Sequence, residues 1–280
     1  MRATVLTRRG DRDLRGPVHE LLALARERDV TLCLDENEVA KHGLRDEPGV
    51  EVCPVGRDVD VCVVLGGDGT ILGALREYAG TDVPVFAVNY GEVGFLATMD
   101  PDGLREGLAL AFSGEFETMA LPSSTVGRPD ASWFAFNDIS VHRQPGRRVA
   151  DLAYGVGGEE IGRVRCDGLV VSTPAGSTGY NLANGGPVLA WGVEGYVVSF
   201  IAPHSFTARA LFVAPDDAMT ITNASHEDEV EVRVDGRPAS TLSPTQDITV
   251  EFGSSSAQLA QLPGASFYHR LRERFGRLAR

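Results

Sequence analysis

An apolar run that breaks into glycines around a single aspartate constrains this chain more than any other feature. Val61–Leu65 has the composition of a buried strand, and the turn Gly66-Gly67-Asp68-Gly69-Thr70 follows it directly. A helix-like stretch begins at Ile71. A strand, a glycine turn and a helix in succession predict backbone N–H groups that can hold an anion, with a carboxylate beside it. This arrangement suits phosphoryl transfer, in which positioning and electrostatics supply most of the catalysis.

The turn matches neither of the two common phosphate-binding patterns. The P-loop pattern G-x-x-x-x-G-K-[S/T] is absent, and Lys41 is the only lysine in the chain. The turn is not the dinucleotide fingerprint G-x-G-x-x-G either. A purely structural turn is the simpler alternative, with glycines that supply positive φ angles and with Asp68 as the helix cap. Further turns rich in Gly, Asn and Asp downstream favour a binding site.

The net charge and the lysine content limit which kinds of molecule the protein can bind. The formal net charge is −13, and 25 of the 26 basic residues are arginines, because Lys41 is the only lysine. No basic stripe is visible along the sequence, so we expect no nucleic-acid partner. An acidic surface favours a high-salt cytoplasm, and an arginine-rich coding bias is the alternative.

Apolar runs and cysteine spacing indicate the compartment. No apolar run approaches the roughly 20 residues that a membrane span needs. The first residues also lack the apolar core of a signal peptide. We therefore expect a cytoplasmic protein with no membrane partner. The cysteines show no C-x-x-C spacing, which favours buried free thiols over a metal site or a disulfide, and the scattered histidines predict no zinc site. The cysteines are Cys33, Cys53, Cys62 and Cys166.

Residues 1–114 predict an N-terminal Rossmann-like α/β domain. Apolar strand-like runs alternate with amphipathic helix-like stretches, which is typical of a parallel sheet covered on both faces. The strands are expected at Thr4–Leu6, Val30–Leu34, Asp60–Leu65 and Val83–Val88, and the helices at Val18–Arg28, from Ile71 and at Pro101–Phe112.

Residues 115–252 predict a C-terminal β-rich domain of stacked sheets. This stretch is rich in Gly, Ser, Thr and Val, in short alternating segments. Residues 253–280 form a last segment whose basic amphipathic helix, Ser266–Arg280, we expect to pack on the N-terminal domain. The β segments are expected at Trp133–Phe136, Ile139–His142, Leu152–Val156, Val164–Ser172, Tyr196–Ile201, Met219–Thr222, Val230–Val234 and Asp247–Phe252.

Three further motifs lie at or near the ends of predicted strands. Asn89–Leu96 is a second glycine turn, at the edge where open α/β sheets bind ligands, although a structural loop with Phe95 in the core is the simpler alternative. Asn137 and Asp138 place an amide beside a carboxylate, which can hold vicinal hydroxyls or form an Asx turn. Cys166–Asn181 runs from a strand into small and hydroxyl residues, where a flat polyhydroxylated ligand can approach the backbone. It lacks the G-x-S-x-G elbow of serine hydrolases.

Together these motifs resemble those of the NAD kinase family. Residues 66–70 match G-G-D-G-T, residues 89–96 match N-x-G-x-x-G-F-L, and residues 136–138 match F-N-D. Residues 167–181 match D-G-L-V-V-S-T-P-A-G-S-T-G-Y-N, the most specific of the motifs. The first motif also occurs in diacylglycerol, sphingosine and 6-phosphofructokinase relatives.

The resemblance implies a role for each matching residue. Asp68 is expected to be the general base that takes the 2′-hydroxyl proton and to help hold a divalent cation, most simply Mg²⁺. Gly69 and Phe95 are expected to contact the dinucleotide, and Asn137 and Asp138 to bind the ribose and amide on the nicotinamide side. Further dinucleotide contacts are expected from Arg148, Arg165, Asp167, Ala175, Thr178, Gly179, Tyr180, Asn181, Leu182, Ala183 and Arg237.

The resemblance implies an enzyme that uses ATP or inorganic polyphosphate to phosphorylate the adenosine ribose of NAD at its 2′-hydroxyl, which gives NADP. It also implies a homodimer or homotetramer. A lipid kinase of the diacylglycerol or sphingosine type is the runner-up, although the polar Ser172–Asn181 loop suits a nucleotide better than an acyl chain. A dinucleotide-binding regulator without catalysis is a third alternative.

Overall fold

The computed structural model describes residues 1–8, 13–54, 58–92, 94–128 and 131–276. Internal contacts divide the chain into two compact units. The first unit comprises Met1–Ala120 and Ala257–Arg280, and the second comprises Leu121–Ser256. The second unit is therefore an insertion between two parts of the first.

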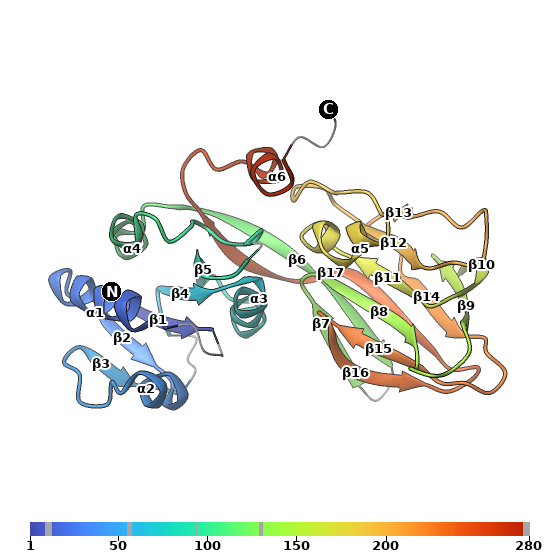
Figure 1. The fold of residues 1–280 in the computed structure, drawn as a ribbon, viewed down its shortest axis with the longest axis horizontal. Helices are drawn as coiled ribbons and strands as arrows, with labels where there is room; N and C mark the ends of the chain where they lie inside the picture. The colour runs from blue at the N-terminus through green and yellow to red at the C-terminus, as the bar shows by residue number, and fades with distance from the viewer. Residues whose placement is uncertain (9–12, 55–57, 93, 129–130, 277–280) are drawn as a thin grey trace. The chain divides into compact units, whose positions relative to one another are not determined.

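A parallel sheet forms the centre of the first unit, in the order β3-β2-β1-β4-β5-β17 (Figure 1). Every pair of neighbouring strands in this order is parallel. The chain builds outward from β1 on one side and from β4 on the other, so the order reverses between these two strands. Open sheets of this kind bind ligands where the order reverses, at the carboxyl ends of the strands. The strands are β1 (Arg2–Thr7), β2 (Thr31–Leu34), β3 (Val50–Val52), β4 (Val61–Gly66), β5 (Pro84–Asn89) and the last part of β17 (Asp247–Gln261).

Helices cover both faces of this sheet. The helices α1 and α4 lie side by side (Figure 1), and both pack into one apolar core with Val63 and Phe86 of the central strands. The helix α3 contacts β4 and β5, and its Ile71 and Leu75 are fully buried. Strands buried on both faces explain why β4 and β5 consist almost entirely of apolar residues. The helices are α1 (Arg15–Glu27), α2 (Glu36–His42), α3 (Asp68–Glu77), α4 (Leu104–Ser113) and α6 (Phe267–Phe275).

The helix α2 was not predicted from the sequence. It begins after Asp35, whose side chain accepts a hydrogen bond from the Glu38 amide, and it ends at Gly43, whose φ is +67°. An Asp N-cap and a left-handed Gly after the last turn are regular helix boundary signals. At seven residues the helix is too short for its apolar periodicity to stand out.

Two antiparallel sheets make up the second unit, which confirms the predicted stacked-sheet fold. One sheet has the order β13-β12-β11-β8-β15-β16, and the other contains β10-β9-β14 and the first part of β17. Their inward side chains form one apolar core that includes Val141 and Leu169 of the first sheet and Leu152 and Ile221 of the second.

The strands β6 and β17 each contain residues of both units. The elements that begin after residue 115 and before β17 are β6 (Glu117–Arg128), β7 (Ala131–Ala135), β8 (Asp138–Arg143), β9 (Ala150–Val156), β10 (Glu159–Cys166), β11 (Gly168–Ser172), η1 (Gly176–Thr178), α5 (Tyr180–Ala183), β12 (Tyr196–Ile201), β13 (Leu211–Val213), β14 (Met219–Asn223), β15 (Val230–Val234) and β16 (Arg237–Leu242).

The predicted single segment Val164–Ser172 is wrong, because the chain forms two strands there. The strand β10 ends at Cys166 and pairs with β9, whereas β11 starts at Gly168 and pairs with β8 and β12 in the other sheet. Asp167 is the one residue between them, at the point where the chain changes sheets. Only one residue separates the end of β10 from the apolar strand β11, so periodicity alone could not separate the two strands.

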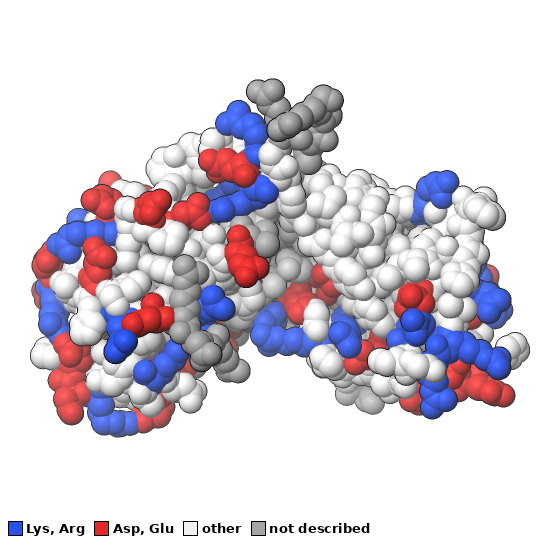
Figure 2. Space-filling model, in the orientation of Figure 1, with Lys and Arg blue, Asp and Glu red and all other residues white. Residues whose placement is uncertain are grey.

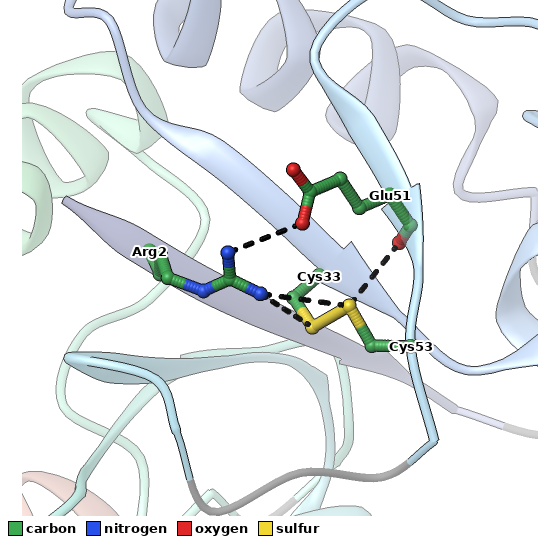
Figure 3. The surroundings of a disulfide bond; sticks show 4 residues. All are labelled: Arg2, Cys33, Glu51 and Cys53. Carbon is green, nitrogen blue, oxygen red and sulfur yellow. Dashed lines mark hydrogen bonds and ion pairs between the residues drawn. A yellow bond between two sulfur atoms is a disulfide. The ribbon is translucent and has the colours of Figure 1, made fainter.

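The prediction of four free thiols is also wrong, because Cys33 and Cys53 form a disulfide (Figure 3). Cys33 lies in β2, and Cys53 directly follows the neighbouring parallel strand β3. The Arg2 guanidinium lies beside both sulfur atoms and pairs with Glu51 at 3.1 Å (Figure 3). Sequence spacing carries no information about this pairing, since the two strands meet only in the folded sheet.

The other two thiols are free and buried, as predicted. Burial raises the pKa of the Cys62 thiol far above its ordinary value and that of Cys166 to about 12. Both are therefore protonated and unreactive at neutral pH.

Acidic and basic side chains are mixed over the face shown in Figure 2, without a basic stripe. Across the described residues, no helix combines the length and apolar character that crossing a bilayer requires.

Candidate functional site

The glycine turn lies between β4 and α3, in the first unit. Gly67 is the N-cap with φ of −97°, and Asp68 is the first residue of the helix. None of Gly66, Gly67 and Gly69 has a positive φ, and the Asp68 side chain does not cap the helix, so both features expected from a purely structural turn are absent. A Cβ on Gly91 would lie 2.7 Å from the Gly67 Cα. Glycine is needed here because two turns touch backbone to backbone.

The Asp68 carboxylate turns toward the second glycine motif rather than toward its own helix. Its two oxygens accept hydrogen bonds from the backbone amides of Phe95 at 3.2 Å and Leu96 at 3.3 Å. Burial raises the pKa of Asp68, while these two bonds and the charges of Arg274 and Arg270 lower it. A carboxylate with a raised pKa and a fixed orientation is suited to general-base catalysis.

Gly69 and Phe95 occupy different environments beside Asp68. Gly69 is exposed, and a Cβ built on it would meet no atom within 4 Å, so a ligand can approach the first turn of α3. The Phe95 ring is 3% exposed and packs against Phe267 and Phe275 of α6. The Phe95 side chain is thus part of the core, as expected if Asn89–Leu96 is a structural loop, while the Phe95 amide holds Asp68.

Asn137 and Asp138 lie at the start of β8, in the second unit, where an aspartate from a distant hairpin fixes them. The Asp235 carboxylate accepts from the backbone amides of Phe136, Asn137 and Asp138 at 3.4, 2.8 and 3.4 Å. In return, the Asp235 amide donates to the Asp138 carbonyl at 2.8 Å. Asp235 and Gly236 form the two-residue turn between β15 and β16, with φ of +46° and +74°.

The side-chain oxygen of Asn137 is poised for a ligand. It is buried, and no donor among the described residues lies within hydrogen-bond distance of it. A buried acceptor without a donor is costly unless a bound group supplies one. The loop after β11 passes very close by, because a Cβ on Gly176 would lie 2.1 Å from the Asn137 carbonyl oxygen. The F-N-D motif and the Ser172–Asn181 segment therefore meet at one place.

Burial and the neighbouring Asp235 raise the pKa of Asp138 to about 7. The side chain is 7% exposed, at the strand position that pairs with Ser172 of β11. At neutral pH this carboxyl group exists in both protonation states, so it can accept a hydrogen bond or donate one.

Two further side-chain pairs complete the arrangement. Asp167 forms an ion pair with Arg143 at 2.5 Å, and both side chains are about one third exposed. The Tyr180 ring stacks on His142 with centroids 5.7 Å apart and planes 10° apart. Burial raises the pKa of Tyr180, the negative charges of Asp138 and Asp167 raise it further, and the positive charge of Arg233 lowers it.

The remaining predicted residues fall into three groups. Ala175 is buried, and Thr178 and Gly179 lie in and after a short 3₁₀ turn. Tyr180–Ala183 forms the helix α5 rather than an open loop, and within it the buried Asn181 amide donates to the carbonyls of Ser177 and Pro187. The exposed arginines Arg148, Arg165 and Arg237 make no side-chain hydrogen bond or ion pair with another described residue.

Sequence reasoning missed the part that Asp235, Arg143 and His142 play. Asp-Gly between two alternating segments is a strong hairpin signal, so the turn at Asp235 was available from the sequence. The amides that its carboxylate binds could not be predicted, because β15 and β8 become neighbours only in the folded sheet.

Comparison with known proteins gives the family. The ATP-NAD kinase N-terminal domain matches residues 18–116, and the ATP-NAD kinase C-terminal domain matches residues 136–262. An NAD kinase of Gemmatimonas aurantiaca is 32% identical over 99% of this chain and 96% of that protein. The chain belongs to the NAD kinase family. An NAD kinase of Symbiobacterium thermophilum is 36% identical over 79% of the chain and 80% of that protein.

Two solved structures share the fold. The yeast NADH kinase complexed with NADH has a TM-score of 0.87 at 22% identity and covers all of this chain and 88% of that one. The NAD kinase from Archaeoglobus fulgidus in complex with ATP has a TM-score of 0.75 at 27% identity and covers 99% of this chain and 98% of that one. The α/β unit with an inserted β unit is thus the NAD kinase fold.

Proposed function

We propose that this chain transfers the γ-phosphoryl group of ATP to the 2′-hydroxyl of the adenosine ribose of NAD, with Asp68 as the general base. Family membership supports the reaction. The amide-held, partly buried carboxylate of Asp68 at the start of α3 is the observation that carries the catalytic assignment. Inorganic polyphosphate is an alternative donor.

In the chemical step, the 2′-oxygen attacks the γ-phosphorus and forms a new P–O bond. The bond from that phosphorus to the β–γ bridging oxygen breaks, and ADP leaves with the electron pair. The hydroxyl proton passes to the Asp68 carboxylate. A secondary alcohol is a poor nucleophile, and a positioned base contributes on the order of 10²–10⁴-fold.

Charge on the transferred group has to be neutralised by groups other than lysine, since the chain has only Lys41. The exposed backbone at Gly69, at the positive end of α3, is one such group. Mg²⁺ is another, because it is commonly held by one or two carboxylates together with substrate phosphates. Asp68 fits that donor set, and no cluster of three or more His, Cys, Asp or Glu occurs in the described parts of the chain. Bound there, Mg²⁺ would neutralise phosphate charge.

The second unit supplies the dinucleotide contacts in this proposal. Asn137 and Asp138 offer an acceptor and a titratable carboxyl group to the hydroxyl and amide groups of the nicotinamide half. The Tyr180 ring, 37% exposed, offers a stacking face to a base. The remaining dinucleotide contacts in this proposal come from Asp167, Ala175, Thr178, Gly179 and the exposed arginines. We also propose that the enzyme is cytoplasmic and works as a homodimer or homotetramer.

The test is NADP⁺ formation from NAD⁺ with ATP and Mg²⁺, at low and at molar KCl, for the wild type and Asp68→Asn. We expect product from the wild type and a loss of at least ~100-fold in Asp68→Asn with the fold intact. Wild-type turnover in a folded Asp68→Asn protein would refute the assignment of the base. No product with ATP or polyphosphate at any salt concentration would favour a lipid kinase, to be screened with diacylglycerol and sphingoid acceptors.

A further inference from the structure

The segment Phe95–Ala97 has two hydrogen-bonded sides, and each serves a different partner within the first unit. On one side, the amides of Phe95 and Leu96 donate to the Asp68 carboxylate. On the other side, the carbonyl groups of Phe95 and Ala97 accept hydrogen bonds from the Arg270 guanidinium of α6. This short backbone segment therefore lies between Arg270 and the Asp68 carboxylate.

The Arg270 guanidinium is itself held in place by a further hydrogen bond. Its second terminal nitrogen donates to the Gln261 side chain, which is 8% exposed. Burial, followed by the charge of Arg274, lowers the pKa of Arg270 to about 10, so it remains charged at neutral pH. A planar fork that donates in several fixed directions suits this task, whereas lysine offers a single flexible donor centre.

Aromatic and ionic contacts fix α6 on the same segment. Phe267 and Phe275, at the two ends of the helix, pack their rings against Phe95 with centroids 5.8 and 5.9 Å away. Arg274 pairs with Asp100 at 2.7 Å, and Asp100 also accepts from the Asn89 amide at 3.0 Å. The helix is amphipathic and carries these contacts along one side.

We propose that Arg270 is a positioning residue of the phosphoryl-transfer reaction, because it fixes through the Phe95–Ala97 backbone the orientation of the Asp68 carboxylate. The inference rests on the proposed role of Asp68 as the base. It gives the C-terminal helix a part in the reaction, since Arg270 holds the carbonyl groups of the peptide segment whose amide groups hold the base.

Amide exchange gives the proposal a second readout. Loss of the Arg270 guanidinium removes the donor to the Phe95 and Ala97 carbonyl groups. The same segment supplies the amides that hold the Asp68 carboxylate, so these amides should become less protected.

Arg270→Gln, Arg270→Lys and Arg272→Gln form the test set, with the wild type and Asp68→Asn beside them. Arg272 is the matched control, because it lies on the same helix, is exposed, and hydrogen-bonds to His269 rather than to the segment. We would measure kcat and KM for NAD⁺ and ATP, and the amide hydrogen exchange of residues 95–98.

Arg270→Gln is expected to lower kcat by ~10- to 100-fold, with KM values within about twofold of the wild type. Its Phe95 and Leu96 amides are expected to exchange faster than those of the wild type. Arg270→Lys is expected to give an intermediate kcat, because lysine keeps the charge but lacks the planar fork that reaches both carbonyl groups. Arg272→Gln is expected to match the wild type in every readout.

Each other outcome decides between the two proposals. An inactive wild type refutes the proposed reaction, and an active Asp68→Asn refutes the role of Asp68 as the base, on which the inference rests. The inference about Arg270 is tested when the wild type is active and Asp68→Asn is inactive. In that case, wild-type kcat in Arg270→Gln overturns the inference alone, and so does an equal loss of kcat in Arg272→Gln. If Arg270→Gln does not fold, Arg270→Lys decides, because wild-type kcat together with wild-type amide protection overturns the inference.

Discussion

The Asp235 carboxylate accepts a hydrogen bond from the Asn137 backbone amide at 2.8 Å, although 98 positions separate the two residues in the chain. The same carboxylate accepts from the amides on either side of Asn137. One side chain in a hairpin turn thus satisfies three consecutive N–H groups at the start of β8. Bonds from N–H groups to an ionised acceptor are about twice as strong as neutral ones.

Asp235→Ala is expected to destabilise the protein by ~2 kcal/mol and to raise KM for NAD⁺, because three amides lose their acceptor and the Asn137 side chain loses its fixed position. Asp235→Asn should be milder, since asparagine keeps one acceptor oxygen and tolerates the positive φ. Thermal unfolding and initial rates check both variants. Asp216→Ala, at an exposed aspartate, is the control, and equal effects from the two Ala variants would contradict the prediction.

Asp138→Asn is expected to change how stability depends on pH in the absence of NAD. The folded state raises the pKa of Asp138 from 3.8 to about 7. The folded protein therefore binds this proton more tightly than the unfolded chain does. The stability that it contributes is complete below about pH 4 and is lost as the pH rises through 7.

The loss in the wild type amounts to about 4 kcal/mol for a shift of this size, and a neutral asparagine avoids it. We expect Asp138→Asn to raise Tm relative to the wild type at pH 8 and much less at pH 5. Differential scanning calorimetry at both pH values checks this. Parallel changes of Tm with pH in the two proteins would contradict the raised pKa.

Gly176→Ala is expected to destabilise the second unit by ~1–3 kcal/mol and to weaken NAD binding, because the added methyl group would collide with the Asn137 carbonyl. Isothermal titration with NAD⁺ and thermal unfolding measure the two effects. Gly192→Ala is the matched control, since a Cβ at Gly192 meets no atom within 4 Å. If both variants behave alike, the close approach at Gly176 does not constrain the site.

Reduction of the disulfide is expected to destabilise the first unit by ~3 kcal/mol, because the bond closes a loop of about 20 residues. Thiol titration of the denatured protein should give two thiols before reduction and four after it, since Cys62 and Cys166 are free. Cys33→Ser should lower Tm as much as reduction does, and reduction should then have no further effect. Four thiols before reduction would contradict the bond.

Local sequence predicted the features that short stretches of chain decide. The buried strand β4, the turn at Asp68 and the helix after it follow from apolar composition and glycine punctuation. The alternating segments of the second unit likewise gave its sheets. In each case the residues that predict the strand, turn or helix are the residues that form it.

Features that depend on which strands become neighbours could not be predicted. The pairing of Cys33 with Cys53, the change of sheet at Asp167 and the contact of Asp235 with Asn137 all require the three-dimensional register. The amides that hold Asp68 lie 27 and 28 positions downstream, so the partners of its carboxylate could not be predicted either. Tertiary geometry, rather than local preference, determines these contacts.

The interrupted first unit has a consequence for synthesis on the ribosome. Leu121–Ser256 is contiguous, so the inserted unit is fully available while the strand partner of β5 and the helix α6 are still to be made. Domains fold as units as the chain emerges. The inserted unit can therefore fold before the first unit is complete. The first unit, which contains the glycine motif with Asp68, also needs Ala257–Arg280, and a ribosome that stops before Ala257 releases a chain in which only the inserted unit is complete.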